Sequence, residues 1–92
     1  METGEMMTIF EKAIAVYGES LQKQVAIEEM AELTKEICKD FRGKANRENI
    51  VEEIADVQIM LYQLMAMYNI SDKELSITLG LKITRLDERL KG

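Results

Sequence analysis

Apolar residues recur every three or four positions along most of the chain, which is the spacing of one face of an α-helix. Together with the turn and capping signals between these stretches, the pattern predicts four helices joined by three short connections. The predicted helices cover residues 5–17, 21–40, 47–68 and 72–90. The chain has no proline and few runs of β-branched residues, so we expect an all-α fold.

Residues that favour helix ends mark the boundaries between these helices. Gly18 is a natural stop for the first helix, and Ser20 and Asn46 can cap the second and third. The run Ser71–Glu74 forms a capping box, in which a hydroxyl and a carboxylate can each serve first-turn amides. The charged connection around Arg42–Ala45 is short, so we expect the second and third helices to pack antiparallel.

The second half of the third helix, Ile59–Tyr68, is apolar almost all round. A helix with that pattern needs cover on several sides, which one small bundle can hardly supply. We therefore predict a four-helix bundle-like subunit that oligomerises through its helices, most simply as a twofold dimer. The fourth helix also carries an apolar side, formed by Leu75, Leu79, Ile83, Leu86 and Leu90.

Length and charge narrow the class of protein. A chain of 92 residues makes one domain, residues 1–92, and the formal net charge of −5 argues against a nucleic-acid partner, which calls for a basic surface. No uncharged stretch is long enough to cross a bilayer, and we expect no signal peptide because the N-terminal residues lack a basic segment followed by an apolar run. The single cysteine, Cys38, fits a reducing compartment, so we expect a cytoplasmic protein that binds no membrane.

Two acidic motifs lie on consecutive helices: Glu28-Glu29-x-x-Glu32 on the second and Glu52-Glu53-x-x-Asp56 on the third. Helical spacing places Glu29 beside Glu32 and Glu53 beside Asp56, at the edge of each apolar stripe. Antiparallel packing of the two helices can bring both pairs to one point. Four converging carboxylates repel one another unless a cation lies between them.

The available ligands restrict the identity of that cation. A site made only of oxygen ligands suits Mg²⁺, Mn²⁺ or Ca²⁺, whereas structural zinc prefers Cys or His. The chain has no histidine, which also argues against a ferritin-like di-iron centre and excludes a nucleophile activated by histidine. A Walker phosphate loop and a dinucleotide fingerprint are absent. We therefore expect Mg²⁺, with Mn²⁺ as a possible substitute, and such an ion typically engages substrate phosphates.

The runs Glu28–Leu33 and Glu52–Val57 resemble the paired EExxE and ExxD signature of the MazG-type all-α nucleoside triphosphate pyrophosphohydrolases. The similarity spans about residues 24–64, and the fourth helix is similar to the family's closing helix more loosely. The resemblance implies a single MazG-like helical domain that works as a homodimer or a dimer of dimers. It also implies Mg²⁺-dependent hydrolysis of a (deoxy)nucleoside triphosphate to the monophosphate and pyrophosphate, which would serve nucleotide-pool house-cleaning.

The same resemblance implies roles for individual residues. By their positions in the motifs, the metal ligands would be Glu29, Glu32, Glu53 and Asp56. Glu28 would assist catalysis, either as a further ligand or by orienting water.

Basic residues would then hold the triphosphate, because arginine in particular binds phosphate bidentately. Lys82 and Arg85 fall where the family's closing helix tends to carry phosphate-binding residues, and Arg89 follows one turn later. Lys44 and Arg47 in the connection before the third helix are further candidates. The alternative is that these residues are simply solvated on an exposed face.

Base selectivity is not indicated, because the chain has no tryptophan to stack on a base and Leu86 stands where many relatives of the family carry a polar residue. Tyr17, Tyr62, Phe10 and Phe41 could replace the missing tryptophan, although aromatic side chains dominate small cores. Two alternatives therefore stay open. One is a narrower enzyme on the same scaffold that acts on dUTP and dCTP or on phosphoribosyl-ATP. The other is a non-catalytic helical interaction module whose acidic faces are solvated or bind a partner.

Overall fold

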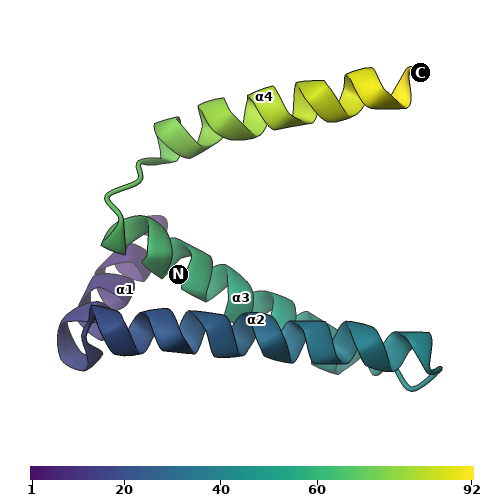
Figure 1. The fold of residues 1–92 in the computed structure, drawn as a ribbon. Coiled ribbons are helices and arrows are strands. Elements are labelled where there is room, and N and C mark those ends of the chain that lie inside the picture. The colour runs from purple at the N-terminus through teal and green to yellow at the C-terminus, as the bar shows by residue number, and fades with distance from the viewer.

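A computed structural model describes all 92 residues and contains four α-helices and no strand (Figure 1). The helices are α1 (Thr3–Tyr17), α2 (Glu19–Phe41), α3 (Arg47–Met67) and α4 (Asp72–Leu90). The all-α prediction is confirmed, and every predicted helix end lies within two residues of the observed one. None of the four helices combines the length and hydropathy that crossing a bilayer requires.

Two of the three predicted helix caps are confirmed. The Asn46 side-chain oxygen accepts hydrogen bonds from the first-turn amides of Glu48 and Asn49, at 2.9 and 3.3 Å. The Ser71 hydroxyl accepts one from the Glu74 amide at 3.1 Å, and this is the half of the predicted capping box that forms, since the Glu74 carboxylate makes no hydrogen bond. The prediction that Ser20 caps α2 is wrong, because α2 already begins at Glu19. Gly18 alone separates α1 from α2, and its φ of 88° lets the chain turn directly from one helix into the next.

A closed turn joins α2 to α3 and sets the two helices antiparallel. Gly43 adopts a φ of 71°, and its amide donates to the Asp40 carbonyl at 3.0 Å. The amide of Lys44 reaches back to the Lys39 carbonyl at 2.9 Å. This pair of bonds is a Schellman motif, which satisfies carbonyls that the end of a helix leaves free. The predicted antiparallel packing of α2 and α3 is confirmed (Figure 1).

The helices α1, α2 and α3 pack together and form the body of the molecule, in which the α2–α3 contact is the most extensive. The buried apolar residues are few: Phe10, Ala26 and Met60. The Phe10 ring of α1 stacks on Tyr62 of α3 with 5.7 Å between centroids. Phe10 and Tyr62 thus pack in the body.

A buried amide pair crosses the α2–α3 contact. The Gln22 side-chain nitrogen donates to the Gln63 side-chain oxygen at 2.6 Å, and both residues are buried. Neither amide can move without leaving a buried polar group unpaired, which costs more than the bond itself contributes. The pair therefore fixes the register of α2 against α3.

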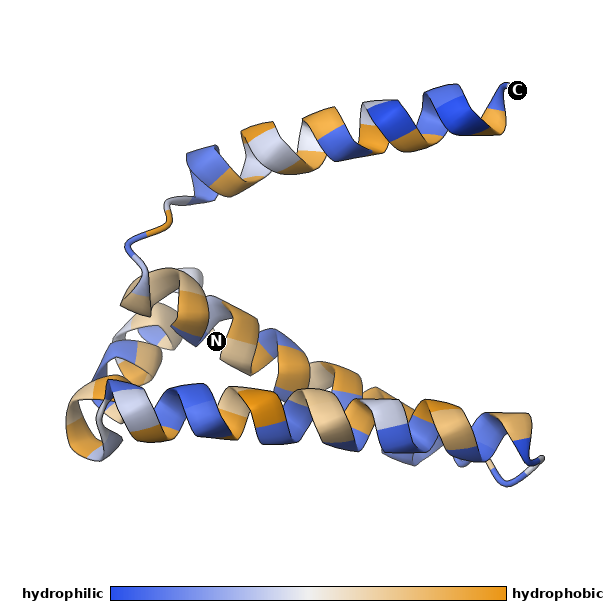
Figure 2. Cartoon of the chain, in the orientation of Figure 1, coloured by the Kyte–Doolittle hydropathy of each residue, from blue (hydrophilic) through white to orange (hydrophobic).

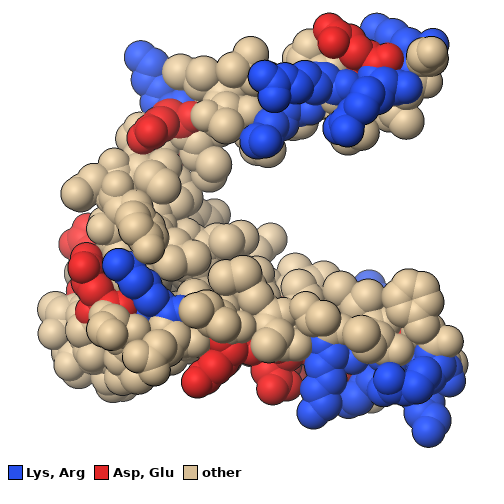
Figure 3. All heavy atoms as spheres, viewed as in Figure 1, with Lys and Arg blue, Asp and Glu red and all other residues tan.

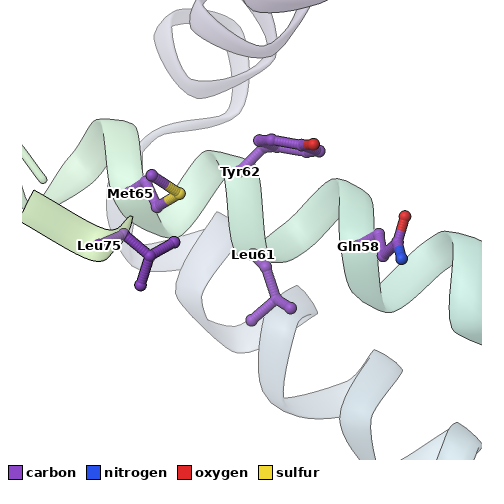
Figure 4. Close-up of a pocket in the computed structure, with 5 residues that line it drawn as sticks. All are labelled: Gln58, Leu61, Tyr62, Met65 and Leu75. Atoms are coloured by element: carbon purple, nitrogen blue, oxygen red, sulfur yellow. The ribbon is translucent and has the colours of Figure 1, made fainter. Parts of the chain in front are cut away.

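The fourth helix departs from the predicted four-helix bundle. It projects from the end of α3 and packs along none of the other three helices (Figure 1). Only its first turn approaches the body, where Leu75 borders a pocket of about 240 Å³ with Gln58, Leu61, Tyr62 and Met65 (Figure 4). The radius of gyration is accordingly 16.0 Å, compared with about 12 Å for a compact domain of this length. We call this projecting helix the α4 arm.

The amide pair generates a prediction about stability. Replacing Gln63 with Ala should lower the free energy of unfolding by about 1–3 kcal/mol, because the Gln22 amide loses its partner while it stays buried. The apolar double replacement Gln22→Leu with Gln63→Met should recover most of this loss. Urea unfolding followed by circular dichroism measures both effects.

Gln24→Ala, which alters an exposed glutamine of α2, serves as the matched control. Equal destabilisation by Gln24→Ala and Gln63→Ala would show that the buried pair has no special role.

Candidate metal centre

Three acidic side chains converge at the α2–α3 contact. Glu29 comes from α2, and Glu53 and Asp56 come from successive turns of α3. One carboxylate oxygen from each lies within 4.8 Å of the other two. The antiparallel pairing of the helices brings the two motifs together, and the spacing of three residues places Glu53 and Asp56 on one face. We call these three residues the acidic triad.

The acidic triad is partly withdrawn from water. Glu29 and Glu53 are half-buried, and one carboxylate oxygen of Glu53 is fully buried and has no hydrogen-bond partner. A buried carboxylate oxygen without a donor is unfavourable, because it loses its hydration and gains nothing in exchange. A positive ligand beside the unpartnered Glu53 oxygen would offset this cost.

The electrostatics of the acidic triad follow from this burial. The pKa of Glu29 is raised, first by burial and then by the charges of Asp56 and Glu53, with a hydrogen bond to Asp56 and the charge of Glu32 adding to the effect. The pKa of Glu53 is raised as well, again first by burial and then by Asp56 and other acidic neighbours. Each of these two carboxyls holds its proton more strongly than it would in water. The site without a cation therefore resists full ionisation.

Glu32, the fourth predicted ligand, lies beside the acidic triad but outside the group of oxygens that come within 4.8 Å. Its charge nevertheless raises the pKa of both Glu29 and Glu53. The structure thus brings together three of the four predicted ligands and leaves the fourth as a neighbouring charge. A change in the Glu32 side-chain rotamer would be needed for it to join the other three.

Glu36 is a member of this acidic region that the sequence did not single out as a ligand. It is buried, one of its oxygens accepts from the Lys39 ammonium at 3.0 Å, and its other oxygen is buried without a partner. Its charge also raises the pKa of Glu53. The available signal was its spacing of seven residues from Glu29, which places both on one helical face. Lys39 pairs with Glu36, and no lysine or arginine forms an ion pair with the acidic triad.

The predicted catalytic and phosphate-binding residues lie elsewhere in the single chain. Glu28 is exposed on α2, outside the acidic triad. Lys44 and Arg47 are exposed near the start of α3, and Arg47 precedes Glu53 by about 9 Å of helix rise. On the α4 arm, one hollow is lined by Lys82, Arg85, Glu88 and Arg89.

Figure 3 shows basic side chains gathered along the α4 arm, away from the body. Since the α4 arm packs along none of the other helices, its basic residues and the acidic triad are not brought together within one chain.

The oxygens of the acidic triad are close enough together for a small divalent cation to be held after side-chain adjustment. Oxygens on an octahedral Mg²⁺ at 2.0–2.1 Å lie about 3 Å apart when adjacent and about 4 Å apart when opposite. The 4.8 Å limit on the three oxygens is close to these values, so small rotamer changes would complete the coordination. Three protein ligands would leave positions open for water or phosphate oxygens, as is usual for Mg²⁺. The residues present therefore fit the predicted ion.

Comparison of the chain with protein-family models, with curated proteins and with solved structures found no match. The resemblance to a pyrophosphohydrolase family therefore depends on the two acidic motifs themselves.

The raised pKa values generate a prediction about pH dependence. Glu29 and Glu53 keep their protons to a higher pH in the folded chain than in the unfolded chain, where the ordinary value is 4.5. As the pH falls from 7 toward 4.5, the folded state therefore takes up protons first and gains stability relative to the unfolded state. In the presence of EDTA, the free energy of unfolding from urea titrations should rise over this range.

Glu53→Gln should raise stability at pH 7 and flatten this pH dependence, because it removes one of the charges in the acidic triad. Glu11→Gln, on the exposed surface of α1, is the matched control and should leave the slope unchanged. A slope in Glu53→Gln as steep as in the original chain would contradict the prediction.

Proposed function

We propose that this protein is a Mg²⁺-dependent nucleoside triphosphate pyrophosphohydrolase, which converts a (deoxy)nucleoside triphosphate to the monophosphate and pyrophosphate. The observation that carries the proposal is the convergence of Glu29, Glu53 and Asp56 at the α2–α3 contact, where Glu53 has one buried carboxylate oxygen without a hydrogen-bond partner. Such a cluster is unfavourable without a cation, and oxygen ligands select a hard one. The family resemblance of the two acidic motifs supplies the reaction class.

In this proposal the acidic triad holds the ion, and Glu32 lies ready as a fourth carboxylate. Held there, Mg²⁺ would supply positive charge that neutralises the phosphate oxygens and polarises the phosphorus. Glu28 or another carboxylate outside the ligand set orients a water molecule and accepts its proton. Water adds across the phosphoric anhydride bond that joins the monophosphate to pyrophosphate, and that bond breaks. The side chains of the chain therefore supply ligands and a base, without a covalent intermediate.

The triphosphate needs positive charge in addition to the ion. Lys82, Arg85 and Arg89 form a cationic face on the α4 arm, with Lys44 and Arg47 as further candidates. Arg85 and Arg89 lie one turn apart and can hold neighbouring phosphate oxygens through bidentate contacts. Since this face does not reach the acidic triad within one chain, we include a homodimer or a dimer of dimers in the proposal.

Two other functions compete with this one. A narrower enzyme that acts on dUTP and dCTP, or on phosphoribosyl-ATP, would use the same acidic triad and differ only in the base it accepts. A non-catalytic helical interaction module is favoured by a separate observation, the many large apolar side chains that are exposed on every helix. The two experiments below separate these three functions.

The first experiment is a nucleotide panel. Pyrophosphate release should require Mg²⁺ and a nucleoside triphosphate, and the preferred base distinguishes a general enzyme from a narrow one. Glu53→Gln should lower kcat by at least about 100-fold, because a metal ligand contributes to transition-state stabilisation. Glu11→Gln should leave kcat unchanged. Mg²⁺-dependent turnover retained in Glu53→Gln would refute the role of Glu53 as a ligand.

The second experiment measures metal binding without substrate. A cation that binds only the folded chain raises the free energy of unfolding, by about 2.7 kcal/mol when its concentration is 100 times the Kd. We therefore expect Mg²⁺ and Mn²⁺ to shift the urea midpoint upward, and Asp56→Asn to weaken the shift. The interaction module predicts no shift at any Mg²⁺ concentration, and that outcome would remove the basis of the hydrolase proposal.

A further inference from the structure

The α4 arm has an apolar stripe that nothing in its own chain covers. No residue of α4 is buried, and the side chains of the stripe are between 45% and 77% exposed. Figure 2 shows the stripe as repeated apolar turns along the projecting helix. Its members are Leu75, Leu79, Ile83, Leu86 and Leu90.

In proteins most of the stability of a helix comes from packing of its apolar face, and the α4 arm has no such packing within its own chain.

A second uncovered apolar surface lies on the body. Exposed residues on α2 and α3 recur at helical spacing and are between 40% and 67% exposed. On each helix these exposed residues are rotated in the same direction about the helix axis, away from the residues that make the α2–α3 contact. Because α2 and α3 are antiparallel, this rotation places both sets of residues on the same side of the helix pair. We call this surface the α2–α3 face, and its members are Ile27, Met30, Ile37, Ile54 and Leu61.

The accessible area shows how much surface is uncovered. The chain exposes 7311 Å², whereas a folded monomer of 10.6 kDa exposes about 5,500 Å². The excess of about 1,800 Å² is comparable to what one subunit buries in an obligate dimer, where the total runs from about 2,000 to 5,000 Å². A second copy of the chain is therefore large enough to cover what is exposed.

The connection between α3 and α4 directs the α4 arm away from its own body. The amide of Ile70 donates to the Met65 carbonyl at 2.8 Å and that of Asn69 to the Ala66 carbonyl at 3.3 Å, with Asn69 at a φ of 54°. These bonds form a second Schellman motif, directly followed by the Ser71 cap of α4. The hydrogen bonds of this turn fix the direction in which the arm leaves α3.

Charge also favours docking of the arm on another body. Residues 1–71 contain 13 acidic and 7 basic side chains, a net charge of −6, whereas residues 72–92 contain 4 acidic and 5 basic ones, a net charge of +1. Electrostatic complementarity of this kind speeds association and disfavours wrong partners. The acidic body and the basic arm are therefore opposite in sign.

We propose that two copies of this chain exchange their α4 arms, so that the apolar stripe of each arm packs on the α2–α3 face of the other copy. The exchange is reciprocal about a twofold axis, so one contact is formed twice. The proposal concerns assembly alone and does not depend on nucleotide hydrolysis or on metal binding.

The first test uses the intact chain in the presence of EDTA. Sedimentation equilibrium should give a dimer, and mixing labelled with unlabelled chains should give isotope-filtered NOEs between methyl groups of the α4 stripe and the α2–α3 face of the other copy. A monomer at about 100 μM, far above the Kd of a typical obligate dimer, would overturn the proposal. So would a dimer in which the α4 arm shows NOEs only to its own body, since the arm would then fold back within its chain.

The second test compares two lysines introduced on the α4 arm. Leu79→Lys places a charge in the apolar stripe and should weaken dimerisation by at least about 100-fold, because the charge must be desolvated at both copies of the contact. Thr84→Lys adds the same charge on another side of the arm and should leave the dimer constant within about threefold. Equal effects of the two substitutions would overturn the assigned stripe, and neither measurement involves the proposed activity.

Discussion

The packing of α2 against α3 is the constraint on which the rest of the structure depends. Ala26 of α2 is buried, and the buried Gln22–Gln63 pair fixes how far one helix is shifted along the other. A shift of one turn would unpair both amides, which is costly in a buried setting. The same register places Glu29 opposite Glu53 and Asp56, so the geometry of the acidic triad follows from the contact that stabilises the fold.

In this arrangement the contact that stabilises the fold also brings carboxylates together at an energetic cost. Apolar burial holds α2 and α3 together, but it also withdraws carboxylates from water and brings their charges close. Structures usually avoid such conflicts, and where one occurs it is commonly at a functional site. The Lys39–Glu36 ion pair relieves part of the repulsion at one end of the cluster, and the acidic triad itself has no such counter-charge.

Local signals in the sequence were sufficient for the secondary structure. Helical periodicity, the Asn46 and Ser71 caps and the short connection after α2 led to four helices and an antiparallel pair, all of which the structure contains. The prediction that Ser20 caps α2 failed because Gly18 adopts a positive φ, so that α2 begins directly after it without a side-chain cap. Local signals therefore fail where a glycine changes the path of the chain.

The site was only partly predictable, for a geometrical reason. Spacing of three or four residues identifies a shared helical face, but it does not give the rotation of that face toward the neighbouring helix. That rotation brings Glu29 into the acidic triad, leaves Glu32 beside it and buries Glu36. The direction of the α4 arm was equally hidden, because it depends on the hydrogen bonds of a few residues around Asn69. Oligomeric state, ion and activity stay predictions.

The chemistry of the Gln22–Gln63 pair has a consequence for how the acidic triad can work. Amide side chains do not titrate in the physiological range, and a bond between two neutral groups is barely screened by salt. The alignment of α2 and α3 is therefore insensitive to the protonation and ionic conditions that alter the carboxylates a few residues away. The scaffold can hold its shape while the charge it surrounds changes.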